Sequence, residues 1–69
     1  MMYNYSKLLG IMKEKGVTQS HLSDKIGISE ASLNKKLKNN SQFKPTEMEA
    51  ILSFLSIPME QLESIFFTH

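Results

Sequence analysis

Hydrophobic side chains recur along this chain at intervals of three and four residues, the spacing of amphipathic α-helices, and no stretch shows the alternation typical of strands. Glycine, proline and short polar runs divide the pattern into five segments. We expect helices at about residues 4–15, 19–25 and 30–38, a fourth that Pro45 and Thr46 open, and a last one with Pro58 in its first turn. The pattern therefore predicts an all-α protein, a compact five-helix bundle.

The expected helix ends carry recognisable capping residues. Thr18 and Ser29 offer hydroxyl N-caps to the second and third helices, and Gly27 between them suits the positive φ that closes a helix. Thr46 and Glu49 have the N-cap to N3 spacing of a capping box. These signals predict that the second and third helices are joined by a very short turn.

Composition narrows the chemistry that the chain can carry. Its 69 residues are enough for one small domain, spanning residues 1–69. The sequence has no cysteine, and His21 and His69 lack a ligand-like spacing, so we expect no disulfide, metal site or cofactor. It shows no paired carboxylates, no nucleophile beside a base and no glycine-rich phosphate loop. We therefore expect neither an enzyme nor a small-molecule substrate, and we expect His21 to be a surface or half-buried structural residue.

The sequence also bears on location. No apolar run approaches the roughly 20 residues that a membrane span needs, and the first residues lack the order of a signal peptide. We expect a cytoplasmic protein without a membrane partner.

The net charge of +1 conceals an uneven distribution of charge. Residues 1–44 hold all eight lysines and three acidic residues, a net charge of +5, whereas residues 45–69 hold four glutamates and no lysine, a net charge of −4. Four lysines fall within ten residues, at positions 35, 36, 38 and 44. Such a cluster attracts a polyanion, although lysine clusters are also common on solvated helix faces. Charge alone leaves both interpretations open.

A more specific pattern covers residues 18–37, TQSHLSDKIGISEASLNKKL. Ser23 is small where a second helix must pass close, Gly27 turns the chain four residues later, Ile28 plugs the turn and Leu33 packs back. This spacing meets the steric demand of two short helices that cross steeply over a turn of three to four residues. One face of the third helix is then left exposed.

This segment resembles the helix-turn-helix of the lambda-repressor-like superfamily, the Xre and Cro/CI-type regulators of phages and their bacterial hosts. The following run, LKNNSQFKPTEMEAILSFLSI, and the aromatic end at Phe66 and Phe67 are similar to small phage-encoded Cro-like proteins. The resemblance implies a transcriptional regulator, a phage or prophage repressor, that places helix 30–38 in the major groove of a double-stranded DNA operator. Such a protein is nucleoid-associated when bound.

The sequence departs from the superfamily pattern at three points. Ser23 stands where alanine is commonest, and Lys36 stands where an apolar residue is more usual, with Leu37 taking up the packing one residue later. The chain also has no arginine, the residue that most often reads guanine.

The resemblance assigns base reading to five residues, Ser29, Glu30, Ala31, Asn34 and Lys35. Lys35 can donate to guanine, Asn34 can pair with adenine and Ala31 can meet a thymine methyl group. Glu30 either accepts from cytosine, bonds to a neighbour such as Gln19, or marks a surface that does not bind DNA. For two of these residues a role without DNA stays open: Ser29 can be only a helix cap, and Asn34 can be only a solvated polar residue.

Phosphate contacts are expected from seven residues, Thr18, Gln19, Ser20, Lys36, Lys38, Asn40 and Lys44. The first three lie at the start of the second helix, where unpaired N–H groups and the helix dipole favour an anion, and ordinary solvation is their alternative. Lys36 meets either phosphate or solvent, because a rotation of its helix by a third of a turn decides which.

A single short recognition helix reads few base pairs, so we expect a homodimer on a two-fold operator. Three C-terminal residues offer interface area, Ile65, Phe66 and Phe67. Core packing is the favoured role of Ile65 and Phe66, whereas both roles stay open for Phe67.

A second function stays open beside DNA binding. The same scaffold would suit a protein-binding modulator or antirepressor whose partner is a phage repressor. The low net charge, the absence of arginine and the carboxylate of Glu30 in the reading helix motivate this alternative.

Overall fold

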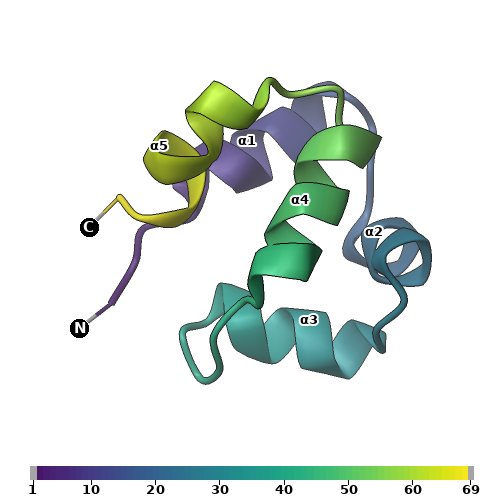
Figure 1. Cartoon of the computed structure of the whole chain (residues 1–69). Coiled ribbons are helices and arrows are strands. Elements are labelled where there is room, and N and C mark those ends of the chain that lie inside the picture. The colour runs from purple at the N-terminus through teal and green to yellow at the C-terminus, as the bar shows by residue number, and fades with distance from the viewer. Residues whose placement is uncertain (1, 69) are drawn as a thin grey trace.

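The computed structural model of the protein describes residues 2–68, and within them it contains five α-helices and no strand (Figure 1). The helices span Ser6–Glu14 (α1), Gln19–Ile26 (α2), Glu30–Leu37 (α3), Pro45–Phe54 (α4) and Leu62–Phe66 (α5), and a 3₁₀ turn at Met59–Gln61 (η1) leads into α5. The all-α prediction is confirmed. None of these helices has the length and apolar character needed to cross a membrane.

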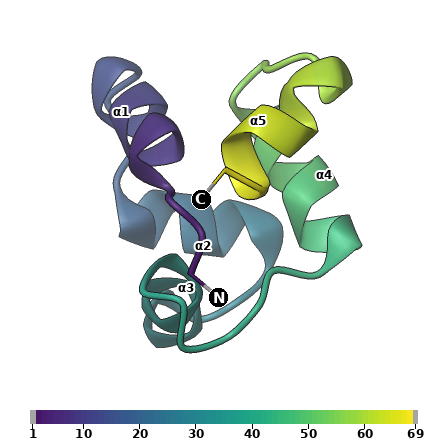
Figure 2. The same ribbon diagram turned by 90° about the vertical axis from the view of Figure 1, so that its left-hand side faces the viewer.

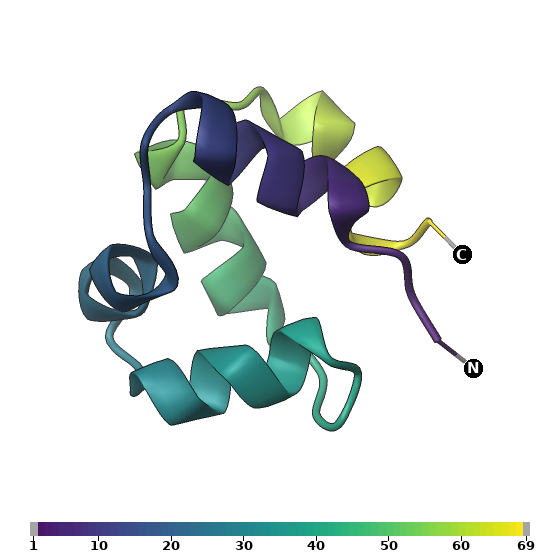
Figure 3. The ribbon, with the colours of Figure 1, turned by 180° about the vertical axis from the view of Figure 1, so that it is seen from behind.

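The helices pack around one core inside a molecule of 26 × 25 × 21 Å. α1 and α5 lie near one end of α4, and α3 lies at its other end (Figures 1 and 3). Eight side chains are almost completely buried. All five helices contribute to this set, and Leu55 is the residue that caps the end of α4. The eight are Leu8, Leu22, Leu33, Ile51, Leu52, Leu55, Ile65 and Phe66. Because full burial of one such side chain contributes about 1.5–3 kcal/mol, this cluster is the main source of stability.

An aromatic cluster extends the core toward the chain ends. Tyr5 and Phe43 meet edge to face with ring centroids 5.4 Å apart, and Phe43 meets Phe66 in the same way at 5.3 Å. Burial of Tyr5, and to a smaller extent the neighbouring Tyr3, raises the pKa of the Tyr5 phenol. The cluster ties the segment before α1 to the loop after α3 and to α5.

The first three helices begin and end within two residues of their predicted limits. The start of α4 differs, and the predicted capping box at Thr46 and Glu49 was wrong. Lys44 is the N-cap, Pro45 is the first helical residue, and the carboxylate of Glu47 accepts the backbone N–H of Lys44 at 2.8 Å. Pro45 has the fixed φ of a first helical residue, so α4 begins there and the cap moves two residues toward the N-terminus.

Candidate nucleic-acid interface

α2 and α3 are two short helices joined by a turn of only three residues, 27–29. Gly27 closes α2 in the left-handed conformation with φ +78°. The hydroxyl of Thr18 accepts the His21 N–H at 3.1 Å, and the hydroxyl of Ser29 accepts the Ser32 N–H at 3.1 Å. Both predicted N-caps are confirmed, and α2 and α3 cross steeply (Figure 1).

Buried side chains hold this pair of helices together. Leu22 of α2 and Leu33 of α3 have no exposed surface. Ser23 is also buried, and its hydroxyl donates to the backbone carbonyl of Ser20 at 2.9 Å, so the small polar residue is satisfied where the helices approach. The inner faces of α2 and α3 are thereby buried in packing, and the outer face of α3 is exposed to solvent.

The five predicted base-reading residues are spread along α3: Ser29, Glu30 and Ala31 lie at its start, Asn34 in its middle and Lys35 in its last turn. Ser29, Glu30, Ala31 and Lys35 are exposed, whereas Asn34 is half-buried. Residues 30 and 34, like 31 and 35, are four apart and therefore neighbours on one helix face. The side-chain amide of Asn34 donates to the Gln19 Oε1 atom at 3.3 Å. The Gln19 side-chain oxygen thus accepts from Asn34, and among the described residues no hydrogen bond joins Gln19 to Glu30, the alternative partner.

Six of the seven predicted phosphate ligands are accessible. Thr18 and Ser20 at the start of α2 are exposed and Gln19 is half-buried, and beyond α3 three exposed residues follow, Lys38, Asn40 and Lys44. The structure brings the first group to one end of the α2–α3 pair and the second group to the loop between α3 and α4.

Lys36 departs from the expectation that it meets phosphate or solvent. Its side chain is 7 % exposed, its ammonium lies 3.0 Å from the Glu47 Oε1 atom, and it donates to the backbone carbonyl of Gln42 at 3.1 Å. α3 is rotated so that Lys36 takes the core-facing position, and Leu37 beside it is only partly buried. A buried and neutralised ammonium does not contact phosphate, so we remove Lys36 from the interface.

Glu47 is the residue that makes this burial of a lysine possible. Burial by itself would raise the pKa of the Glu47 carboxyl, but the hydrogen bond from the Lys44 backbone and the hydrogen bond and charge of Lys36 outweigh it. The pKa therefore lies below its ordinary value of 4.5, and Glu47 is ionised at neutral pH. The ion pair fixes α3 to the start of α4.

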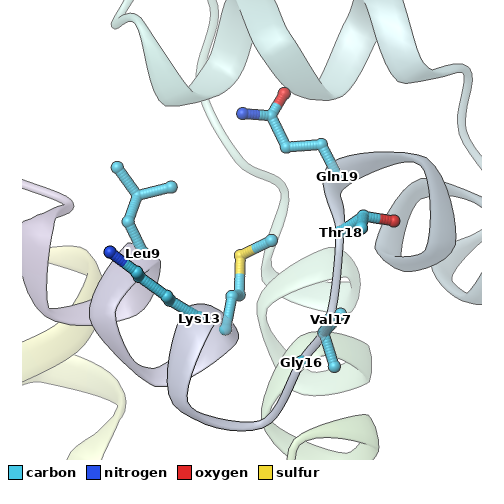
Figure 4. Close-up of a pocket in the computed structure, with 7 residues that line it drawn as sticks. Leu9, Lys13, Gly16, Val17, Thr18 and Gln19 are labelled. Carbon is cyan, nitrogen blue, oxygen red and sulfur yellow. The ribbon is translucent and has the colours of Figure 1, made fainter.

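A shallow groove of about 410 Å³ lies between the end of α1 and the start of α2. Lys13 and the 41 %-exposed Leu9 line its α1 side, and Thr18 and Gln19 line its α2 side (Figure 4). Lys13 thus adds a positive charge beside the start of α2. Sequence reasoning missed it, because only the turn after α1, which Gly16 closes, brings α1 back beside α2.

The three predicted interface residues at the C-terminus have different environments. Ile65 and Phe66 are buried in the core, as their favoured role required. Phe67 is 42 % exposed and packs edge-on against Tyr3 with ring centroids 5.7 Å apart. Phe67 also lines an apolar groove of about 460 Å³ together with Phe43 and other residues of the α3–α4 loop, α4 and α5. Only Phe67 of the three is available to a partner.

Within residues 2–68 no group of three or more metal-ligating side chains is close enough together to hold a metal ion. His21 is exposed, and its ring packs edge-on against Phe54 with centroids 5.3 Å apart, which fits the predicted structural role. His69 lies outside the described residues.

The fold and this surface define a small all-α protein in which two closely joined helices present a polar face rich in lysine. The chain belongs to the family DUF739, described as a protein of unknown function, whose model matches residues 1–69. No curated protein shows significant similarity to it. The family description gives no activity or ligand.

Proposed function

We propose that the chain is a sequence-specific DNA-binding transcriptional regulator, a Cro-like repressor that inserts α3 into the major groove of an operator. α2 and α3 act as the helix-turn-helix that residues 18–37 resemble. Exposed residues of α3, from its first turn to Lys35 in its last turn, read base edges, and residues at the start of α2 and after α3 contact the flanking phosphates.

The observation that carries this proposal is the distribution of lysines along α3. Lys36 points inward and is neutralised by Glu47. Lys35 and Lys38 are exposed, and no ion pair among the described residues engages either of them. Their uncompensated charge lies on the side of α3 that the core does not use. A polyanion such as duplex DNA is the ligand that such a face attracts.

The proposal is tested by titrating the protein against a random duplex pool at low and moderate salt and sequencing the bound fraction. Lys35→Ala is expected to weaken binding to the selected sequence by about 1–3 kcal/mol and relax its specificity. Lys38→Ala is expected to weaken binding to all sequences and to make the slope of log Kobs against log[salt] shallower by about 0.9. Lys25→Ala, which removes an exposed lysine from the end of α2, is the matched control. Binding by Lys35→Ala and Lys38→Ala that equals that of the control Lys25→Ala and of the wild type would count decisively against DNA recognition by α3.

We also propose that two copies pair on a two-fold operator, with exposed Phe67 and its groove as the contact. Sizing with light scattering, with and without the selected duplex, gives the number of copies. Phe67→Ala is expected to reduce cooperative binding to the two-fold operator more than it reduces the affinity for an isolated half-site.

A second candidate function is binding to a partner repressor. It is favoured by Glu30, an exposed carboxylate on the face of α3 that would otherwise meet DNA. The expected result is then co-purification with a repressor and no retention on DNA even at low salt. Glu30→Gln separates the two candidates, because it is expected to weaken a contact with a basic protein surface but to leave or strengthen non-specific DNA binding.

A further inference from the structure

The end of α3 differs from the ends of the other long helices. α1, α2 and α4 each close with a left-handed residue, followed by an apolar residue whose N–H bonds to the carbonyl five residues back: Val17 to Met12 at 2.8 Å, Ile28 to Ser23 at 3.0 Å, and Ile57 to Leu52 at 2.8 Å. These three residues pack partly buried against the core, the usual apolar contact of this turn. At the end of α3 the same turn is made by Asn40, whose N–H bonds to the Lys35 carbonyl at 2.8 Å, but Asn40 is polar and exposed.

Asn39 supplies the anchor that the missing apolar residue would provide. It adopts the left-handed conformation with φ +65°, where glycine fits at the least cost. Its side chain does what glycine cannot: Oδ1 accepts the Tyr3 backbone N–H at 2.7 Å, and Nδ2 donates to the Tyr3 carbonyl at 2.9 Å. Both main-chain groups of Tyr3 are thus paired with one half-buried amide.

Tyr3 is in turn held by the body of the protein. Its ring packs against Tyr5 and Phe67, and the backbone N–H of the next residue, Asn4, donates to the carbonyl of Thr68. Figure 2 shows this N-terminal segment running from α1 to the end of α3. The end of α3 is therefore braced against both terminal segments through a single side chain.

We infer that Asn39 is a positioning residue for DNA binding: the Asn39–Tyr3 clamp holds the two residues that flank Asn39, Lys38 and Asn40, in a fixed place from which they contact phosphate. The inference rests on the proposed function. Both flanking residues are exposed and polar, so without the clamp only the backbone bonds of the turn would order them. Ordering them would then be paid for during binding, and affinity would fall although no contact is removed.

The test replaces Asn39 by glycine, which keeps the left-handed turn and deletes the clamp. Ser56→Gly is the matched control, because Ser56 at the end of α4 is also a non-glycine residue with positive φ, +57°. Amide hydrogen exchange is expected to quicken at Tyr3 and Asn40 in Asn39→Gly but not at core amides such as that of Ile51. Affinity for DNA is expected to fall about tenfold, the cost of ordering roughly one further backbone residue in the turn that carries Lys38 and Asn40.

The salt dependence separates positioning from contact. In Asn39→Gly the slope of log Kobs against log[salt] is expected to match that of the wild type, because Lys38 still reaches phosphate, whereas in Lys38→Ala it becomes shallower by about 0.9. Wild-type affinity in Asn39→Gly, or unchanged exchange at Asn40, overturns the inference and leaves the proposed function standing. A wild-type protein that binds no DNA overturns the proposed function and the positioning role together.

Discussion

The buried ion pair between Lys36 and Glu47 allows the rotation of α3 to be tested by a double-mutant cycle. The single variants are Lys36→Met and Glu47→Leu, and the third is the double variant. In the wild type the side chains of Lys36 and Glu47 are 7 % and 9 % exposed, and their charged atoms are 3.0 Å apart. Each substitution replaces a charged group by an apolar group of similar length or bulk, so the cycle changes charge while largely preserving packing.

The expected magnitudes follow from what each single variant leaves behind. Removing one partner of a buried ion pair costs about 3–5 kcal/mol, because the other charge stays buried without compensation. The loss of stability in Lys36→Met is expected at or below the lower end of this range. Glu47 still accepts the backbone N–H of Lys44 at 2.8 Å, and the helix dipole stabilises its charge in the first turn of α4. The loss of stability in Glu47→Leu is expected at the upper end, because the buried Lys36 ammonium is left with one hydrogen bond, to the backbone carbonyl of Gln42. The double variant is expected within about 1–2 kcal/mol of the wild type, because an apolar pair of similar volume is often neutral.

The assay is urea unfolding at neutral pH followed by circular dichroism. A chain of 69 residues has a total stability of roughly 3–10 kcal/mol, so Glu47→Leu is expected to be partly unfolded even without urea. Additive single effects below about 0.5 kcal/mol would refute the reasoning, since that is the behaviour of an exposed pair. They would also return Lys36 to the set of phosphate ligands. If the two substitutions are instead strongly coupled, the double variant should bind DNA like the wild type, whereas Lys35→Ala should bind DNA more weakly.

Three further predictions follow from burial and backbone conformation. The lowered pKa of Glu47 stabilises the fold above its ordinary pKa of 4.5, and this stability is lost as pH falls through the lower native pKa; Glu47→Gln should flatten the dependence of the urea midpoint on pH in that acid range. Gly10→Ala, in the interior of α1 with open space at its Cβ position, should raise the free energy of unfolding by about 0.5–1 kcal/mol, whereas Gly27→Ala at φ +78° should lower it by about 1–2 kcal/mol. Phe66→Ala should cost about 3–5 kcal/mol in thermal unfolding and Phe67→Ala less than about 1 kcal/mol, because only Phe66 is fully buried.

Each of these has an outcome that contradicts it. An unchanged acid profile in Glu47→Gln would place the acid sensitivity on other carboxylates. Equal effects of alanine at Gly10 and Gly27 would mean that the two glycines share one backbone conformation. A large loss of stability in Phe67→Ala would show that the groove beside Phe67 belongs to the core.

Features decided by local hydrogen bonds and helical periodicity were predictable from the sequence. Thr18 and Ser29 cap α2 and α3 through bonds to residues three positions away, and such bonds depend on little beyond the adjacent chain. Leu33 was expected to pack back against the second helix, and it is fully buried. Together with Ser23, Gly27 and Ile28, these residues predicted the α2–α3 pair and its exposed face.

Features decided by contacts distant in sequence were not predictable. Lys36 and Leu37 differ by about 100° around α3, and the choice between them depends on Glu47 of the next helix, which gives the lysine a buried partner. The clamp between Tyr3 and Asn39 joins residues 36 positions apart and leaves no periodic trace in the sequence. In the sequence Asn39 stands in a short polar run after the third helix, where an asparagine that ends a helix cannot be told from one that binds a distant main chain.

The bond between Asn4 and Thr68 has a consequence for the order of events during synthesis. α1 is translated before α5, yet the segment before α1 is anchored by residue 68, and the core that α1 joins is completed by Ile65 and Phe66. At about 5–20 residues per second, several seconds of elongation separate these partners. The early helices, marginally stable by themselves, therefore gain their full packing only once α5 has been synthesised.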